Sequence, residues 1–120
     1  MIYNAIKANE DINKCNTSII NISLPDTITY DSETVAQYQV INNICYVNLW
    51  LRQVLSSNNV TYSTSIEGLP KAAMGMSFSF IGENTKSNGL GLISGTTIML
   101  YKLPVDNADN IAISFSCPIA

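Results

Sequence analysis

Hydrophobic and polar residues alternate with a period of two along most of the chain after residue 17. The pattern is clearest over residues 74–80, where Met and Phe alternate with Gly and Ser, and over residues 111–117, where Ile, Phe and Cys alternate with Ala and Ser. Because successive side chains of a β-strand point to opposite faces of the sheet, this alternation predicts strands with one buried face.

Turn-forming residues divide the alternating pattern into about eight predicted strands. These cover residues 18–24, 37–41, 44–54, 60–66, 74–80, 90–93, 97–103 and 111–117. Asn42-Asn43 is expected to form a two-residue hairpin turn, since Asn tolerates the positive φ that both central positions of such a turn require. Residues 26–35 are expected to form a polar loop. Short strands at regular spacing predict an all-β fold, an antiparallel β-sandwich that is jelly-roll-like.

Two of the predicted strands are apolar on both faces. Residues 44–54 carry Val and Leu on one face and Tyr46 and Trp50 on the other, and Tyr101 lies on the second face of residues 97–103. A two-layer sandwich buries one face of each strand, so the second face needs cover from a loop, from the N-terminal arm or from another chain. Since aromatic side chains are typical interface anchors, we predict a homo-oligomer with Tyr46, Trp50 and Tyr101 near the subunit contact. In the alternative, the N-terminal arm folds back over this face in a monomer.

The N-terminal residues 1–17 differ from the rest of the chain. They contain two Lys and two acidic residues among small polar neighbours, and they lack the period of two. We expect a linker or an arm that leads into a single β-sandwich head domain at residues 18–120; a short helix or the end of a coiled coil is an open alternative for the arm. No apolar run predicts a signal peptide or a membrane span.

Small polar residues replace much of the charge that a globular chain usually carries. Charged residues make up 12% of the chain, whereas 14 Asn, 13 Ser and 9 Thr are present. This composition favours turns and solvated loops, and it fits a protein that works outside a cell or on a particle. The net charge is −3 and the six basic residues are scattered, so we expect neither nucleic acid nor membrane insertion.

The residue types present exclude most catalytic chemistry. The chain has no His and no Ser-x-x-Lys sequence, so the usual nucleophile and base pairs cannot be built. Asp106 and Asp109 share a turn, and turn acids usually serve the turn rather than catalysis or calcium binding. The Cys residues at 15, 45 and 117 lack a CxxC spacing, so we expect buried free thiols, no metal site and no cofactor. We therefore predict that the chain is not an enzyme.

The order of features from residue 38 to residue 117 resembles the C-terminal head domains of bacteriophage tail fibres and baseplate receptor-binding proteins. Such domains commonly open with a hairpin that here spans residues 38–47, with Tyr38 and the turn Asn42-Asn43. Leu69-Pro70 follows after a further strand, and then come a strand of alternating Phe and Ser, a short Gly-rich strand and a closing strand. After Leu-Pro the family usually has Gly-Tyr-x-Pro, where this chain has Lys-Ala-Ala-Met.

This resemblance implies a trimeric jelly roll, broadly like complement-type and tumour-necrosis-factor-type domains. It implies a virion protein of the phage tail, or otherwise of an extracellular particle surface, that contacts other virion proteins. Such a protein binds a receptor on the host surface, often a saccharide, and it is not enzymatic. The alternative is a purely structural virion or pilus-type subunit that makes only protein–protein contacts.

The resemblance carries no ligand-binding residues over, so position alone supplies the candidates. Loops at one end of a sandwich commonly hold ligand contacts, while a plain solvated loop is the alternative. Tyr62 is a further candidate, because an exposed aromatic ring can stack on a sugar. The candidate ligand-binding residues are Asn84, Lys86, Asn88, Asp106, Asn107 and Tyr62.

Overall fold

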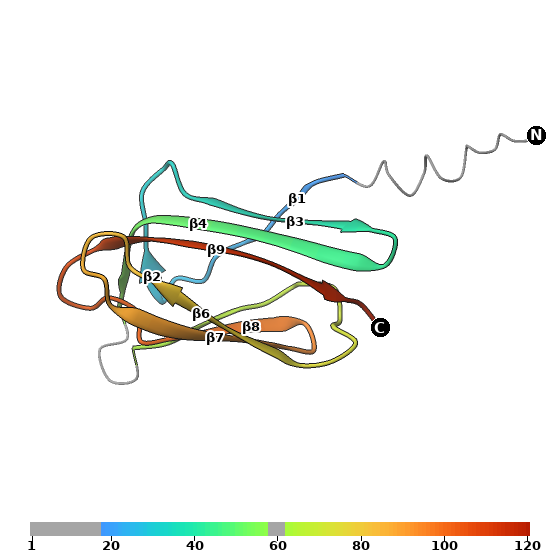
Figure 1. Cartoon of the computed structure of the whole chain (residues 1–120). Helices are drawn as coiled ribbons and strands as arrows, with labels where there is room; N and C mark the ends of the chain where they lie inside the picture. Colours follow the sequence, from blue (N-terminus) through green and yellow to red (C-terminus); the bar gives the residue numbers. More distant parts are fainter. Residues whose placement is uncertain (1–17, 58–61) are drawn as a thin grey trace, which may run out of the picture.

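The computed structural model describes residues 18–57 and 62–120, which form nine strands in two antiparallel sheets. Figure 1 shows the two sheets as layers, with β3, β4 and β9 in one and β6, β7 and β8 in the other. The predicted antiparallel β-sandwich is therefore confirmed. Among the described residues, no helix is long and apolar enough to cross a membrane.

The first sheet is built around the long strand β4 (Ile44–Ser56). On one side β4 pairs with β3 (Val35–Ile41), which in turn pairs with the short β1 (Ile20–Asn21). On its other side β4 pairs with β9 (Asp109–Pro118), and the last two residues of β4 also pair with β2 (Ile28–Thr29). Strands far apart in the sequence thus meet on β4.

The second sheet has the strand order β5 (Thr64–Ile66), β8 (Thr97–Tyr101), β7 (Asn88–Ser94) and β6 (Met76–Ile81). Two isolated bridges connect segments flanking this sheet to β9 of the first sheet and to the residue that follows it. They pair Ala72 with Ile119 and Gly82 with Ile111. These bridges close one side of the sandwich, so that the loop after β6 lies beside the start of β9.

The turn between β3 and β4 has the predicted geometry. Asn42 and Asn43 have φ values of 53° and 64°, which is the left-handed conformation that a type I′ hairpin turn requires at both positions. This turn fixes the register of the hairpin, in which Ile41 lies opposite Ile44. The inward and outward faces of β4 follow from that register.

The core lies between the sheets and is filled by the inward positions of the alternating strands. Burying one such aliphatic side chain stabilises the fold by about 1.5–3 kcal/mol. The alternation predicted over residues 111–117 is confirmed, and that over residues 74–80 is confirmed from residue 76 onward, with Phe80 and Ile113 buried and the intervening Ser residues exposed. Met74, predicted on the packed face, lies before β6 and is exposed. The side chains with no exposed surface include Leu49, Leu51, Val54, Ile66, Ile93, Ile98 and Leu100.

Two glycines of β7 lie directly under aromatic rings of β6. A Cβ at Gly89 would overlap the ring of Phe80, and a Cβ at Gly91 would overlap the ring of Phe78. The Phe78 ring is held from its other side, since it stacks on Phe115 of β9 at a centroid distance of 4.7 Å. The Gly-x-Gly sequence of this strand therefore serves packing.

The N-terminal part of the described chain differs from the sequence-based expectation. The polar loop predicted for residues 26–35 is wrong in part, because Ile28 is only 3% exposed and belongs to β2. The strand predicted over residues 18–24 shrinks to the two exposed residues of β1. The arm predicted for residues 1–17 lies outside the described residues.

Candidate functional site

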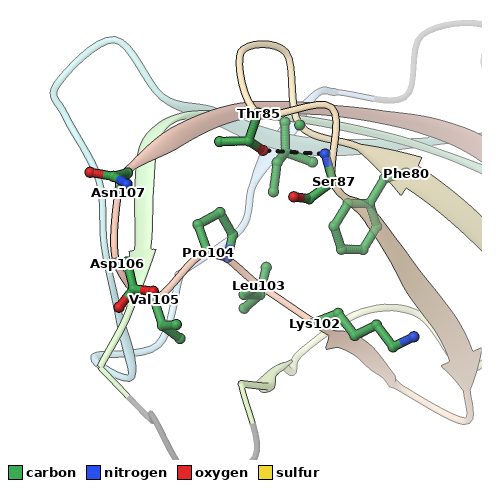
Figure 2. A pocket seen from close by; sticks show the side chains of 11 residues that line it. Phe80, Thr85, Ser87, Lys102, Leu103, Pro104, Val105, Asp106 and Asn107 are labelled. Atoms are coloured by element: carbon green, nitrogen blue, oxygen red, sulfur yellow. Dashed lines mark hydrogen bonds between the residues drawn. The ribbon is translucent and has the colours of Figure 1, made fainter.

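Two loops meet at one end of the sandwich and enclose a pocket of about 260 Å³. One loop, residues 82–87, connects β6 to β7, and the other, residues 102–107, follows β8. Figure 2 shows Thr85 and Ser87 on one side of this pocket and the segment from Lys102 to Asn107 on the other. The full lining comprises Phe80, Gly82, Thr85, Ser87, Lys102, Leu103, Pro104, Val105, Asp106, Asn107 and Ile111.

The loop of residues 82–87 is closed by its own hydrogen bonds. The Gly82 N–H donates to the Ser87 carbonyl at 2.9 Å, and the Lys86 N–H donates to the Gly82 carbonyl at 3.0 Å. The Ser87 N–H donates to the Thr85 hydroxyl oxygen at 3.2 Å. Lys86 takes a positive φ of 61° in this turn, and its ammonium group donates to the Glu83 carbonyl at 2.8 Å. The loop thus holds Thr85 and Ser87 in place at the pocket.

The buried carboxylate of Asp109 anchors this loop to β9. Oδ1 accepts hydrogen bonds from the N–H groups of Asn84 and Asn110, at 2.9 and 2.8 Å. Oδ2 accepts from the Thr85 N–H at 3.0 Å and from the Thr85 hydroxyl at 2.7 Å. A Cβ at Gly82 would overlap Oδ2, so the absence of a side chain there lets the carboxylate approach the loop.

These contacts set the charge state of Asp109. Burial by itself raises the pKa of this carboxyl group, but the hydrogen bonds from the Thr85 hydroxyl and from the N–H groups of Asn84, Thr85 and Asn110 outweigh it. The pKa therefore lies well below the ordinary value of an aspartate. Asp109 is a charged structural acceptor whose oxygens are already occupied by loop donors.

Asn110 ties the same loop to the irregular part of β4. Its side-chain oxygen accepts from the Gln53 N–H at 2.9 Å, where the pairing of β4 and β9 shifts register. Its amide nitrogen donates to Glu83 Oε1 at 2.8 Å, and its carbonyl accepts from the Glu83 N–H at 2.9 Å. The pocket wall formed by residues 82–87 is thus fixed at two successive residues of β9.

The opposite wall is also held by backbone contacts. The Leu103 N–H donates to the Tyr62 carbonyl at 2.8 Å, and the Pro104 carbonyl accepts from the Ser56 N–H at 2.7 Å. Leu103 is buried, whereas Lys102 and Asp106 of the same segment are exposed and lie at the rim of the pocket. The pocket therefore combines an apolar floor with hydroxyl, amide, ammonium and carboxylate groups at its mouth.

The structure brings the two predicted candidate loops together, but not through every predicted side chain. Asp106 and Asn107 line the pocket as expected. The other loop contributes Thr85 and Ser87, while the predicted Asn84, Lys86 and Asn88 do not line it. Tyr62 is exposed, and its carbonyl contacts the pocket segment at Leu103.

The sequence reasoning missed Thr85, Ser87, Lys102 and the Pro104 wall. Within a six-residue turn, which side chains face inward depends on the hydrogen bonds of that turn. The polar composition of residues 84–88 predicted the loop, but it did not indicate which of the loop side chains face the pocket. The one sequence feature that could have identified Lys102 is its position as the charged residue directly after the apolar strand β8.

The three aromatic residues predicted for a subunit contact lie on two different faces. Tyr46 and Trp50 are each 48% exposed on the outer face of the first sheet. Tyr101 is half-buried on the outer face of the second sheet, opposite Leu90. A subunit contact that contains all three would therefore have to use both outer faces of the protomer.

The buried thiols of Cys45 and Cys117 lie directly opposite each other in β4 and β9. Burial is the main cause that raises the pKa of Cys45 to about 11, and the neighbouring Cys117 adds to the increase. Burial also raises the pKa of Cys117. The prediction of buried free thiols is confirmed for these two, and Cys15 lies outside the described residues. Within residues 18–57 and 62–120, no three metal-ligating side chains gather at one place.

Comparison with known proteins gives one informative likeness. No protein-family model matches the chain, and no curated protein matches it. Among solved structures, the crystal structure of the head domain of phage bIL170 is similar over 88% of this chain and 100% of that domain, with a TM-score of 0.56 and 18% sequence identity. This chain has the fold of a phage head domain. That structure was described in the context of the receptor-binding domains of lactococcal phages, and the resemblance stated above is confirmed as a likeness of fold.

Proposed function

We propose that this chain is the receptor-binding head of a phage tail fibre or baseplate protein, located in the virion, which binds a saccharide on the host surface without catalysis. The observation that carries the proposal is the fold likeness across the whole length of the bIL170 head domain. The pocket between residues 82–87 and 102–107 supports it, because its rim offers hydrogen-bonding groups on a rigidly held scaffold. Pre-ordered loops reduce the entropy cost of binding a flexible ligand.

A homo-oligomer, with a trimer favoured, is part of this proposal. The outer face of the second sheet carries Leu90 at 48% and Ile81 at 51% exposure, with Leu92 and Met99 beside them. Aliphatic side chains on the exposed face of a sheet are the kind of surface that another protein chain covers. Tyr101 shares this face, so we expect it at the subunit contact.

The receptor-binding proposal is tested with the 120-residue chain labelled with a fluorophore and added to host cells. Lys102→Ala and Asn107→Ala are expected to weaken binding several-fold each, because both side chains lie at the pocket rim. Lys71→Ala is the matched control, since it removes an exposed ammonium group from another part of the surface. Absence of cell binding by an oligomeric wild-type chain would instead favour the purely structural subunit.

The oligomeric state is measured by size-exclusion chromatography with light scattering. Leu90→Glu is expected to produce monomers, because it places a charge in the centre of the aliphatic face. Met74→Glu adds the same charge at an exposed apolar residue outside the two sheets, and it should leave the oligomer intact. A wild-type monomer at micromolar concentration would refute this part of the proposal.

A further inference from the structure

The outer face of the first sheet presents two exposed aromatic rings on one strand. Tyr46 and Trp50 of β4 are each 48% exposed, while the intervening Val47 and Leu49 point into the core. Four residues of extended strand place the two rings about 14 Å apart along β4. Asn48 lies between them on the same face and is exposed.

The strands on both sides of β4 surround Tyr46 and Asn48 with uncharged polar groups, whereas Trp50 lies opposite Val35 and Ala112. Residues directly opposite in a sheet share a face. Tyr46 lies opposite Gln39 of β3 and Ser116 of β9, and Asn48 lies opposite Gln37 and Ser114 in the same way. A shallow groove of about 350 Å³ runs across this area, and it is lined by Ile19, Gln37, Tyr38, Gln39, Tyr46, Val47, Asn48, Ser114, Phe115 and Ser116.

The groove lining contains no carboxylate, ammonium or guanidinium group. Charge on this face begins beyond Trp50, where the Arg52 guanidinium lies 5.5 Å from the centre of the Trp50 ring. Arg52 also forms an ion pair with Glu33, with an N–O distance of 3.6 Å. A ligand lying over Tyr46 and Asn48 thus meets a neutral surface, and an ion would find no counter-charge there.

The chemistry of this face matches an uncharged saccharide better than it matches a protein or a nucleic acid. The C–H face of a sugar ring packs on an aromatic ring, while its hydroxyl groups exchange hydrogen bonds with amides and hydroxyls such as those of Asn48 and Ser114. A nucleic acid would require cations that the groove lacks. A second copy of the chain finds a more apolar surface on the other sheet, around Leu90.

We propose that the outer face of the first sheet, from Tyr46 to Trp50, binds a linear neutral oligosaccharide that lies along β4. This surface is distinct from the pocket between residues 82–87 and 102–107. The inference rests on the proposed receptor-binding function, and it assigns an extended, uncharged stretch of the receptor glycan to this face.

The test uses the full chain on an array of neutral and anionic oligosaccharides. The chain is expected to bind one or more neutral glycans, with little change between low and high salt because no charge pairs form. Tyr46→Ala and Asn48→Ala should each weaken that binding, Tyr46→Ala by about tenfold, which corresponds to about 1.4 kcal/mol. Tyr30→Ala is the matched control, since Tyr30 is 44% exposed and lies outside this groove.

The outcomes separate this inference from the proposed function. Neutral-glycan binding that survives Tyr46→Ala but is lost in Lys102→Ala would overturn the inference and leave receptor binding in place. Binding of host cells without binding of any neutral glycan on the array would also overturn the inference while leaving receptor binding in place. If the wild-type chain binds neither cells nor glycans, both proposals fail. Loss of glycan binding in Tyr46→Ala, with an unchanged melting temperature, supports the inference whatever the cell assay shows.

Discussion

Replacement of Asp109 by Asn should destabilise the protein, although it changes only one atom of a buried side chain. The carboxylate has no exposed surface and accepts four hydrogen bonds, two of them from Thr85 to the same oxygen. An amide keeps one accepting oxygen for Asn84 and Asn110 but places an NH2 group against the Thr85 N–H. Two donors then face each other in a buried site.

The magnitude follows from the number of donors that lose an acceptor. A buried donor left unsatisfied costs about 1–3 kcal/mol. In Asp109→Asn the Thr85 hydroxyl can rotate and accept from the new amide, so one orphaned N–H remains and the free energy of unfolding should fall by about 2 kcal/mol. In Asp109→Ala three backbone N–H groups lose their acceptor instead of one, so the loss should be about three times as large.

The effect should depend on pH with a defined sign. The pKa of Asp109 is lower in the folded protein than in the unfolded chain, where it takes the ordinary value of about 3.9. Its contribution to stability is therefore complete above about pH 4 and declines as the pH falls toward the folded-state pKa, by up to about 1.4 kcal/mol per pH unit. The stability difference between wild type and Asp109→Asn should shrink over this acidic range.

Urea unfolding followed by circular dichroism, at a series of pH values from neutral to strongly acidic, measures both effects. Asp106→Asn is the control, because this exposed acid lies three residues away and its replacement should change stability by less than about 0.5 kcal/mol. An Asp109→Asn protein as stable as wild type at neutral pH would refute the assignment of Asp109 as the loop anchor. A difference that stays constant as the pH falls would refute the proposed charge state.

Further predictions concern the packing of the two sheets. Gly91→Ala should reduce the free energy of unfolding by about 1–3 kcal/mol, because its Cβ would overlap the Phe78 ring and displace it from its stack on Phe115. Gly75→Ala should be nearly neutral in the same urea assay, since its Cβ would make only an ordinary contact at 3.5 Å, and equal effects would refute the argument. In a Cys15→Ser background, the thiols of Cys45 and Cys117 should react with Ellman's reagent only after unfolding, and rapid reaction of the native protein would contradict their burial.

Strand register gives a separate prediction, that Cys45 and Cys117 do not form a disulfide with each other. The Ile119 N–H donates to the Asn43 carbonyl, so Cys45 and Cys117, two residues further along each strand, form a hydrogen-bonded pair. In such pairs the Cβ atoms lie near the upper end of the range of about 4.5–5.5 Å, whereas a disulfide requires about 3.5–4.5 Å. We therefore expect mild oxidants to leave both thiols reduced, which mass spectrometry after trapping would measure.

The sequence predicts the long strands because their pattern is local. Alternation over β6 and β9 and the Asn42-Asn43 turn each depend on neighbouring residues, and the structure confirms them. The period of two over residues 18–24 predicted a longer strand than the two residues of β1, and the two-residue β2 is too short to show a period. The buried Ile28 pairs with the end of β4, nearly thirty residues later in the sequence. No local sequence pattern predicts that contact.

The candidate pocket likewise combines features that a local sequence pattern predicts with contacts between distant residues that it does not predict. The sequence identified both loops that form it, since runs of Asn, Ser, Asp and Lys mark exposed turns. It did not identify Asp109 as the residue that fixes one loop, because its partners Asn84 and Thr85 are about 25 residues away. Nor could it separate Thr85 and Ser87 from Lys86, because that choice is made by the hydrogen bonds of a single turn.

The faces of β4 and β8 show where composition carries more information than hydrophobicity alone. The sequence treated both strands as apolar on two faces and assigned both outer faces to one subunit contact. In the structure, the outer face of the second sheet carries Leu90, Leu92 and Met99, whereas the residues opposite Tyr46 and Asn48 on β3 and β9 are Gln and Ser. Aliphatic groups have no favourable contact except with other apolar surface, so they require a protein partner. Aromatic rings flanked by amides satisfy both the apolar and the hydroxyl parts of a sugar, and we therefore expect one face to assemble the protein and the other to bind its ligand.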